Sequence, residues 1–301
     1  MHVFVVPASP KTGKATIRAL LDDASHPYVT GVYRDLGRVP AEFRNHPRFT
    51  ANKGDVANVG TLKLAGADAV VTITPPLYSE SKPTARAREM AANVKYAIGR
   101  AGGTVQRLVY VSRTGAHLEH GTGDIKTNYE AEQAFAGAAP EVIFVRCAYF
   151  MENWEAALET LNAESPFFYS VLCPEDLRIP MVSVKDIGRT CAAQVLGTGS
   201  SPLPHNPHTF DLQGPRPYST RNVQRAFEAA LEEEVELRLV RDEQLEGFFA
   251  RAFQEPMAGM LAEMTRSFLP GGILAADTYG GFKVRRGTDT LEEVVRGLLA
   301  D

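Results

Sequence analysis

A stretch near the N-terminus has the residue types and the spacing of a phosphate-binding turn: Ser9, Pro10, Lys11, Thr12 and Gly13. It follows the β-branched run 3–6 and precedes apolar residues at helical spacing, which together predict a strand, a turn and a helix. The N-terminus of such a helix offers unpaired N–H groups and a positive dipole, and Lys11 adds its own charge. We therefore predict that this turn binds the phosphates of a ligand.

The glycines of this turn depart from the usual dinucleotide-binding pattern. That pattern has glycine at three places, which here are positions 7, 10 and 13. Only Gly13 is a glycine, and proline, which has no N–H group, stands at Pro7 and Pro10. Two interpretations stay open: the remaining N–H groups still bind a dinucleotide, or Ser9 and Pro10 simply start a well-capped helix.

Further cofactor contacts are expected where the following strands end. Arg34 follows the second predicted strand, where an arginine accommodates the 2′-phosphate of NADP; the alternative is a solvated surface arginine. Asp55 is expected near the adenine, or as the cap of the next helix. Thr74, Pro75 and Ser112 end two successive strands at the edge of the sheet that also holds the turn, which is where ligands bind in open α/β sheets.

Three side chains are candidates for catalysis because they can polarise or protonate a carbonyl group. His120 titrates near neutral pH, which suits a proton donor, although a single loop histidine is more often just exposed. Asn128 can polarise a carbonyl group but cannot supply a net proton. Tyr149 lies in a segment expected at the same edge of the sheet. No residue type identifies a proton donor outright.

Four residues are candidates for substrate binding: Tyr78, Phe150, Asn153 and Phe168. Together with the phenylalanine- and methionine-rich segment 244–268, they suit a flat aromatic substrate. The competing interpretation is that these aromatic residues belong to the core, as most such residues do.

The elements that must position these residues alternate between strand and helix. Nearly continuous apolar runs predict strands at 28–33, 67–74, 107–112 and 141–146, with helices between them, the longest at 84–101. Strands of this kind form parallel sheets that are covered on both faces. The sequence therefore predicts an α/β fold, a Rossmann-type doubly wound parallel sheet.

The alternation ends near residue 150, which divides the chain into a nucleotide-binding domain, 1–150, and a smaller α+β substrate-side subdomain, 151–301. The pieces of the second part are too short to fold alone, so we expect it to be interleaved with the first. Its elements are expected to include a helix at 150–162, an aromatic turn at 166–169, strands at 208–212 and 235–240, and a helical stretch at 244–268.

Composition narrows the class of protein. The 301 residues have a net charge of −4, which gives no support for binding to nucleic acid or to an anionic membrane. No apolar run reaches the roughly 20 residues that span a bilayer, and the N-terminus does not resemble a signal peptide, so we expect a cytoplasmic protein. The three cysteines show no metal-binding spacing and are expected to be reduced and buried, with no metal site.

A series of motifs extends over almost the whole chain: Arg34, 53–55, 66–70 with 74–76, 109–112, Glu132, 145–146, 149–153, 179–182, 186–188 and 290–293. In this order they resemble the NmrA-like branch of the atypical short-chain dehydrogenase/reductases, and within it the oxidoreductase-like members of fungal secondary-metabolite clusters. The resemblance implies a Rossmann-type domain, NADP(H) as the cofactor and a small C-terminal substrate subdomain.

The chain departs from this family at two places besides the prolines of the turn. Active relatives often carry lysine or histidine four residues before the helix glutamate, where this chain has Asn128 before Glu132. The Tyr-x-x-x-Lys signature occurs only as Tyr78 and Lys82, and Pro83 disfavours a helix there.

Three functions stay open. The leading one is an NADPH-dependent reductase of an apolar aromatic carbonyl or quinone-type molecule in secondary metabolism, acting as a monomer or homodimer. The others are a non-enzymatic NAD(P)H sensor that binds a partner protein, and a cyclase or isomerase that uses no cofactor.

Overall fold

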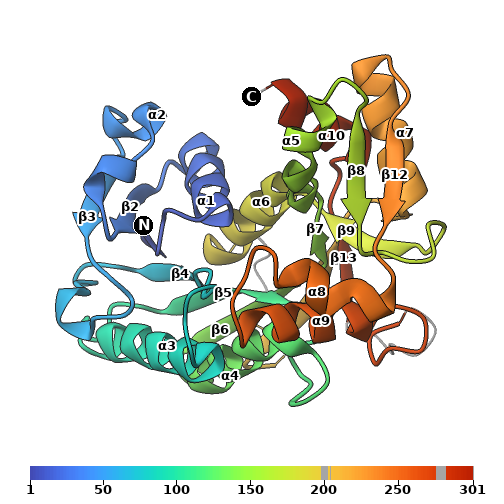
Figure 1. Ribbon diagram of the computed structural model, residues 1–301. Coiled ribbons are helices and arrows are strands. Elements are labelled where there is room, and N and C mark those ends of the chain that lie inside the picture. The colour runs from blue at the N-terminus through green and yellow to red at the C-terminus, as the bar shows by residue number, and fades with distance from the viewer. Residues whose placement is uncertain (198–202, 204, 276–282, 301) are drawn as a thin grey trace.

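In the part of the chain that the structure describes, residues 1–197, 203, 205–275 and 283–300, eight parallel strands form the central sheet of this computed structural model (Figure 1). In spatial order they are β13 (Val284–Arg286), β10 (His208–Gln213), β6 (Glu141–Cys147), β5 (Arg107–Arg113), β4 (Ala69–Ile73), β1 (His2–Val6), β2 (Tyr28–Tyr33) and β3 (Phe49–Lys53). The chain reverses direction across the sheet between β1 and β4. The predicted Rossmann-type doubly wound sheet is therefore confirmed.

Helices cover both faces of the sheet (Figure 1). On one face lie α1 (Lys11–Asp22) and α6 (Val184–Val195), and on the other lie α3 (Pro83–Gly99) and α4 (Lys126–Phe135). Successive side chains of a strand point to opposite faces. In β1, Val3 and Val5 therefore pack with α1 and α6, whereas Phe4 and Val6 pack with α3. Both faces need apolar residues, which is why the strands are continuous apolar runs.

Two glycines bring α1 close to its neighbours. A Cβ atom on Gly13 would lie 2.8 Å from the carbonyl oxygen of Ala8, so only glycine lets the first turn of α1 approach the preceding loop this closely. A Cβ atom on Gly188 of α6 would lie 2.5 Å from the carbonyl carbon of Ala15 in α1. The two helices therefore touch backbone to backbone, and α6 fixes the position of the helix that begins at the predicted phosphate-binding turn.

The second part of the chain forms two smaller sheets. They pack around a third hydrophobic core, separate from the two cores on the faces of the central sheet. These comprise a three-stranded sheet of β11 (Pro217–Tyr218), β9 (Ile179–Val182) and β7 (Tyr149–Phe150), and a two-stranded sheet of β12 (Glu236–Leu239) and β8 (Phe167–Ser170). The core between them and α7 (Thr220–Leu231) and α10 (Leu291–Ala300) includes Trp154. The segment also returns to the central sheet, because β10 and β13 extend it beyond β6.

One local expectation for this part was wrong, and two were right only in outline. The predicted aromatic turn at 166–169 is β8, which pairs in parallel with β12. The predicted helix at 150–162 is a 3-10 helix, η4 (Met151–Ala157), followed by one short helix, α5 (Leu158–Leu161). The expected helical stretch at 244–268 is divided into α8 (Leu245–Phe249) and α9 (Met257–Phe268).

The remaining helices are short. They are α2 (Ala41–Arg44) and the 3-10 helices η1 (Leu36–Arg38), η2 (Val59–Thr61), η3 (Gly123–Ile125) and η5 (Asp242–Gln244). No helix among the described residues is both long and apolar enough to cross a membrane.

Candidate functional site

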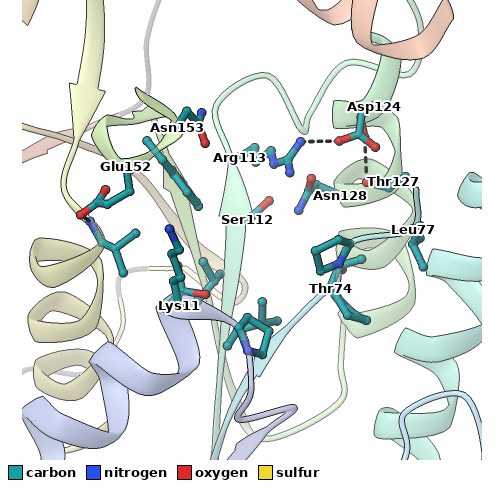
Figure 2. A pocket seen from close by; sticks show the side chains of 18 of the residues that line it. Lys11, Thr74, Leu77, Ser112, Arg113, Asp124, Thr127, Asn128, Glu152 and Asn153 are labelled. Atoms are coloured by element: carbon teal, nitrogen blue, oxygen red, sulfur yellow. Dashed lines mark hydrogen bonds and ion pairs between the residues drawn. The ribbon is translucent and has the colours of Figure 1, made fainter. Parts of the chain in front are cut away.

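A cleft with a volume of about 580 Å³ lies at the carboxyl ends of β4 and β5, beside the N-terminus of α1 (Figure 2). Its wall includes ten of the residues that the sequence singled out: Pro10, Lys11, Thr12, Thr74, Pro75, Tyr78, Ser112, Asn128, Phe150 and Asn153. They come from five separate segments of the chain. The structure thus brings together residues that were predicted for the cofactor, the substrate and the chemistry.

The N-terminus of α1 leaves several N–H groups available to a ligand. The first hydrogen bond of the helix runs from the Lys14 N–H to the Pro10 carbonyl, at 3.0 Å, so the N–H groups of Lys11, Thr12 and Gly13 lie ahead of it. Pro10 is the N-cap, and no side chain caps the helix, so the alternative in which Ser9 caps it does not occur. The first turn also lacks an acidic residue. These groups fit a phosphate anion.

The prolines of the turn are compatible with that fit. Ala8 donates its N–H to the Val32 carbonyl at 2.8 Å, which fixes the loop against β2, and Pro10 occupies the N-cap itself. Gly13 keeps the third glycine's role, the close contact of helix and loop. Lys11 forms an ion pair with Glu155 at the mouth of the cleft, and a ligand phosphate would compete with that carboxylate.

Two arginines follow β2. Arg34 and Arg38 are exposed, and neither forms an ion pair within the described part of the chain. The Gly37 N–H donates to the side chain of Asp35 at 2.9 Å, which shapes the turn that carries both arginines. Arg38 was missed by the sequence analysis, although it lies only four residues after Arg34, at the end of η1. The pair fits the 2′-phosphate position of a dinucleotide.

A buried chain of hydrogen bonds fixes Asn128 at the cleft. Its Nδ2 donates to the Tyr110 hydroxyl at 2.8 Å, and that hydroxyl lies 2.7 Å from the Thr74 hydroxyl. Burial raises the pKa of Tyr110, so the phenol keeps its proton. Apart from its place in the family motif 109–112, nothing marked Tyr110 as functional, because it lies in the middle of an apolar strand. The chain orients two polar groups, Thr74 and Asn128, toward a ligand.

Ser112 belongs to a second buried network. It donates its hydroxyl proton to Glu132 Oε1 at 2.6 Å, and Arg146 binds the two carboxylate oxygens of Glu132 at 2.9 and 2.6 Å. A hydroxyl group has one proton to donate. Ser112 can therefore only accept a hydrogen bond from a ligand in the cleft, and the motif residues Glu132 and Arg146 act by holding it in place.

The profile of the NAD(P)H-binding family matches residues 8–178, more than half of the chain. The chain belongs to the NAD(P)H-binding family. Its matched part contains the α1 turn, Arg34 and the ends of β4 and β5. A search of the curated proteins finds no match.

Solved structures support the same fold over the whole chain. An NADPH-dependent quinone oxidoreductase from Escherichia coli, crystallised with NADPH, matches 99% of both chains with a TM-score of 0.75 and 18% identity. The triphenylmethane reductase of a Citrobacter species, crystallised with NADP(H), aligns with 99% of this chain and 100% of its own chain, with a TM-score of 0.74 and 17% identity. A mutant of NmrA aligns with 99% of this chain and 95% of its own chain, with a TM-score of 0.70 and 18% identity.

The cleft also contains an ion pair that the sequence analysis did not single out. Arg113, the last residue of β5, donates from Nη1 to Asp124 Oδ2 at 2.6 Å, and Figure 2 shows its side chain directed toward Asp124. The Thr127 hydroxyl donates to the backbone carbonyl of Asp124 at 2.7 Å. The only local signal was the position of Arg113 directly after Ser112.

A carboxyl group, that of Glu152, lies on the opposite wall. Its Oε1 accepts a hydrogen bond from the Val184 N–H at 2.8 Å, and its Oε2 is buried without a partner in the described structure. Burial raises the pKa of Glu152, and the Val184 N–H and the charge of Lys11 oppose this effect. The sequence showed Glu152 only as one letter of a family motif.

The other predicted site residues do not line this cleft. His120 is an exposed loop residue beside Glu119, as the competing interpretation had it. Tyr149 packs against Trp154 and Phe268, and burial raises the pKa of its phenol to about 12. These positions give no support to either residue as a proton donor in this cleft.

Phe168 is fully buried and packs against Trp154 and Phe227, so it lies in the core rather than in the cleft. Asp55 accepts the Ala57 N–H at 2.9 Å and shapes the turn after β3. Among the residues that the structure describes, no group of three or more histidine, cysteine or acidic side chains is placed to hold a metal ion.

Proposed function

We propose that the protein is an NADPH-dependent reductase of flat, apolar carbonyl or quinone-type small molecules. The observation that carries the proposal is one shared cleft: the open N-terminus of α1 and the Thr74–Tyr110–Asn128 chain both face it. When bound, the cofactor supplies a hydride. The chain itself orients the carbonyl group through Asn128 and Thr74, and Ser112 offers an acceptor beside them.

The preference for NADPH over NADH rests on Arg34 and Arg38. An acidic residue after β2 would favour the free ribose hydroxyl of NADH, whereas arginine accommodates a 2′-phosphate. Because both guanidinium groups are exposed and have no ion-pair partner in the described chain, binding a phosphate breaks no existing contact.

The apolar character of the proposed substrate rests on the part of the cleft between the loop at 74–78 and η4. Leu77, Tyr78 and Val111 line it on one side and Phe150 on the other. A role in secondary metabolism, a cytoplasmic location and a monomeric or dimeric state follow from the family resemblance and the composition, and we retain them as part of the proposal.

The first test is a titration of the purified protein with NADPH and with NADH, followed by assays of NADPH oxidation with a panel of quinones and aromatic enones. The proposal requires saturable binding that favours NADPH, and turnover of at least one quinone or enone. It is refuted if neither dinucleotide binds.

A second candidate function is an NADPH sensor without catalytic activity. It is favoured by Asn128, which stands where active relatives carry lysine or histidine and which cannot supply a net proton. This function predicts tight binding of NADPH with no turnover on the whole panel. The third alternative, a cyclase or isomerase without a cofactor, predicts activity that does not change when dinucleotide is removed.

A further inference from the structure

At one end of the cleft, the guanidinium group of Arg113 is oriented by an ion pair but keeps N–H donors that have no partner among the described residues. Arg113 donates from Nη1 to Asp124, and the same nitrogen lies 3.8 Å from the sulfur of Met264. Its Nε and Nη2 groups have no protein partner among the described residues, and its side chain is 38% exposed. A guanidinium group has five N–H donors in a fixed plane, so several remain for a ligand.

The carboxylate that orients Arg113 is itself fixed. The Asp124 side chain is only 9% exposed, and α9 packs directly on the neighbouring Gly123. A Cβ atom on Gly123 would lie 2.0 Å from the Met260 carbonyl oxygen, which shows how closely the backbone of α9 approaches η3. Arg113 therefore keeps one geometry before any ligand binds, and little conformational entropy is lost on binding.

An exposed aromatic ring lines the same cleft as this cation. Tyr78 lines the same cleft, is 49% exposed, and its ring centroid lies 5.1 Å from that of Phe253, with an angle of 60° between the rings. Glu155, an acidic residue of the same cleft, pairs with Lys11.

We propose that Arg113 selects substrates whose aromatic ring system carries an acidic oxygen, such as a phenolate or enolate, and that the ring lies against Tyr78 while the oxygen binds Nε and Nη2. This inference rests on the proposed reductase function and names its substrate class. A guanidinium stays charged at every working pH, and charge-assisted hydrogen bonds are the strong ones. A neutral ring of the same size gains only the apolar contact.

The test uses two naphthoquinones of similar size: lawsone, whose hydroxyl group is ionised at neutral pH, and menadione, which is neutral. Their dissociation constants from the protein loaded with NADP⁺, and their kcat/KM values with NADPH, are measured for the wild type and for Arg113→Gln. We expect the variant to lose about 10- to 100-fold more affinity for lawsone than for menadione, the effect of one charge-assisted hydrogen bond. Below the pKa of lawsone this difference should disappear.

Removal of Arg113 leaves the carboxylate of Asp124 unpaired, so the double variant Arg113→Gln/Asp124→Asn, in which both charges are absent, is measured in parallel. It should show the same selective loss. Arg225→Gln, an exposed arginine on α7, is the matched control for net charge and should affect both ligands alike.

Equal losses for lawsone and menadione in both Arg113 variants would overturn the inference. The failure of the inference and that of the proposed function can be distinguished. Menadione reduction without selective lawsone binding refutes only the role of Arg113, whereas the absence of any dinucleotide binding refutes the reductase. If dinucleotide binds but no quinone turns over, the dissociation constants alone decide the inference.

Discussion

Arg34 is the residue on which the choice of dinucleotide depends most directly. Its replacement by alanine should weaken the binding of NADPH about tenfold, because a charged hydrogen bond to phosphate is worth about 1.5 kcal/mol, and should leave NADH binding nearly unchanged. Parallel titrations of both dinucleotides measure the effect. Arg225→Ala, on the exposed face of α7, provides the control for a lost positive charge. An equal loss for NADPH and NADH would show that Arg34 does not read the 2′-phosphate.

Glu152 makes the stability of the protein depend on pH. Because burial raises the pKa of its carboxyl group above the unfolded value, the folded chain binds this proton more strongly. The stabilisation is present at low pH and is lost as the pH rises through the folded pKa. Glu152→Gln keeps an acceptor for the Val184 N–H but carries no charge. The variant should therefore have a higher Tm than the wild type at neutral pH.

Thermal unfolding followed by circular dichroism over a pH series checks this sign. The difference in Tm between Glu152→Gln and the wild type should shrink as the pH falls toward about 4, the ordinary range of a glutamate carboxyl group. Glu155→Gln is the matched control, since Glu155 is half-exposed and pairs with Lys11. This second variant should not raise the Tm at neutral pH. A pH-independent gain for Glu152→Gln would contradict the assignment.

Part of the candidate site could be predicted from the sequence, because the end of an apolar run predicts the end of a strand. Thr74 and Ser112 follow apolar runs, and all parallel strands end at one edge, so their neighbourhood was predictable. Arg113 and Glu152 were not predictable in this way. Their chemistry depends on partners from other elements, Asp124 for one and Val184 for the other, and no local pattern contains those contacts.

At the level of elements, the contact between α1 and α6 determines where the dinucleotide turn lies. Gly188→Ala would place a methyl group 2.5 Å from the Ala15 carbonyl carbon, so the helices must separate. We expect a loss of about 1–3 kcal/mol in the free energy of unfolding, as for overpacking in a core. Binding of NADPH should weaken as well, because α1 carries the phosphate-binding N–H groups.

Urea unfolding of Gly188→Ala, with a titration of NADPH, measures both effects. Gly247→Ala in α8 is the control, since a Cβ atom there meets nothing within 4 Å. It should leave NADPH binding unchanged and should stabilise the helix by up to about 1 kcal/mol. If both alanine variants unfold at the same urea concentration, the close contact of α1 and α6 does not limit stability.

The elements of the central sheet were predictable from sequence, and many of the later ones were not. Buried parallel strands give long apolar runs, whereas β8 is a four-residue strand whose partner, β12, lies about 70 residues further along the chain. Because its sequence does not show that partner, this short aromatic segment was interpreted as a turn. The 3-10 helix η4 likewise has no sequence period that separates it from an α-helix.

In the whole molecule, both parts of the chain contribute residues to the hydrophobic core on one face of the central sheet. Residues beyond 150 supply α6, which covers α1 and one face of the sheet, and also β10 and β13, which extend the sheet (Figure 1). Without them, Ile17 and Leu20 of α1 would lose the apolar residues of α6 against which they pack. We therefore expect that the boundary in the sequence pattern near residue 150 does not separate independent folding units.

This sharing predicts a single unfolding transition. Trp154, the one tryptophan of the chain, lies in the third core, whereas far-UV circular dichroism reports on helices of both parts. Because α6, β10 and β13 join the cores, the fluorescence of Trp154 and the dichroism signal should change at the same urea concentration. If NADPH binds at the α1 end, as we propose, it should shift both midpoints together. A fluorescence change at a clearly lower urea concentration would instead show that the part around Trp154 unfolds by itself.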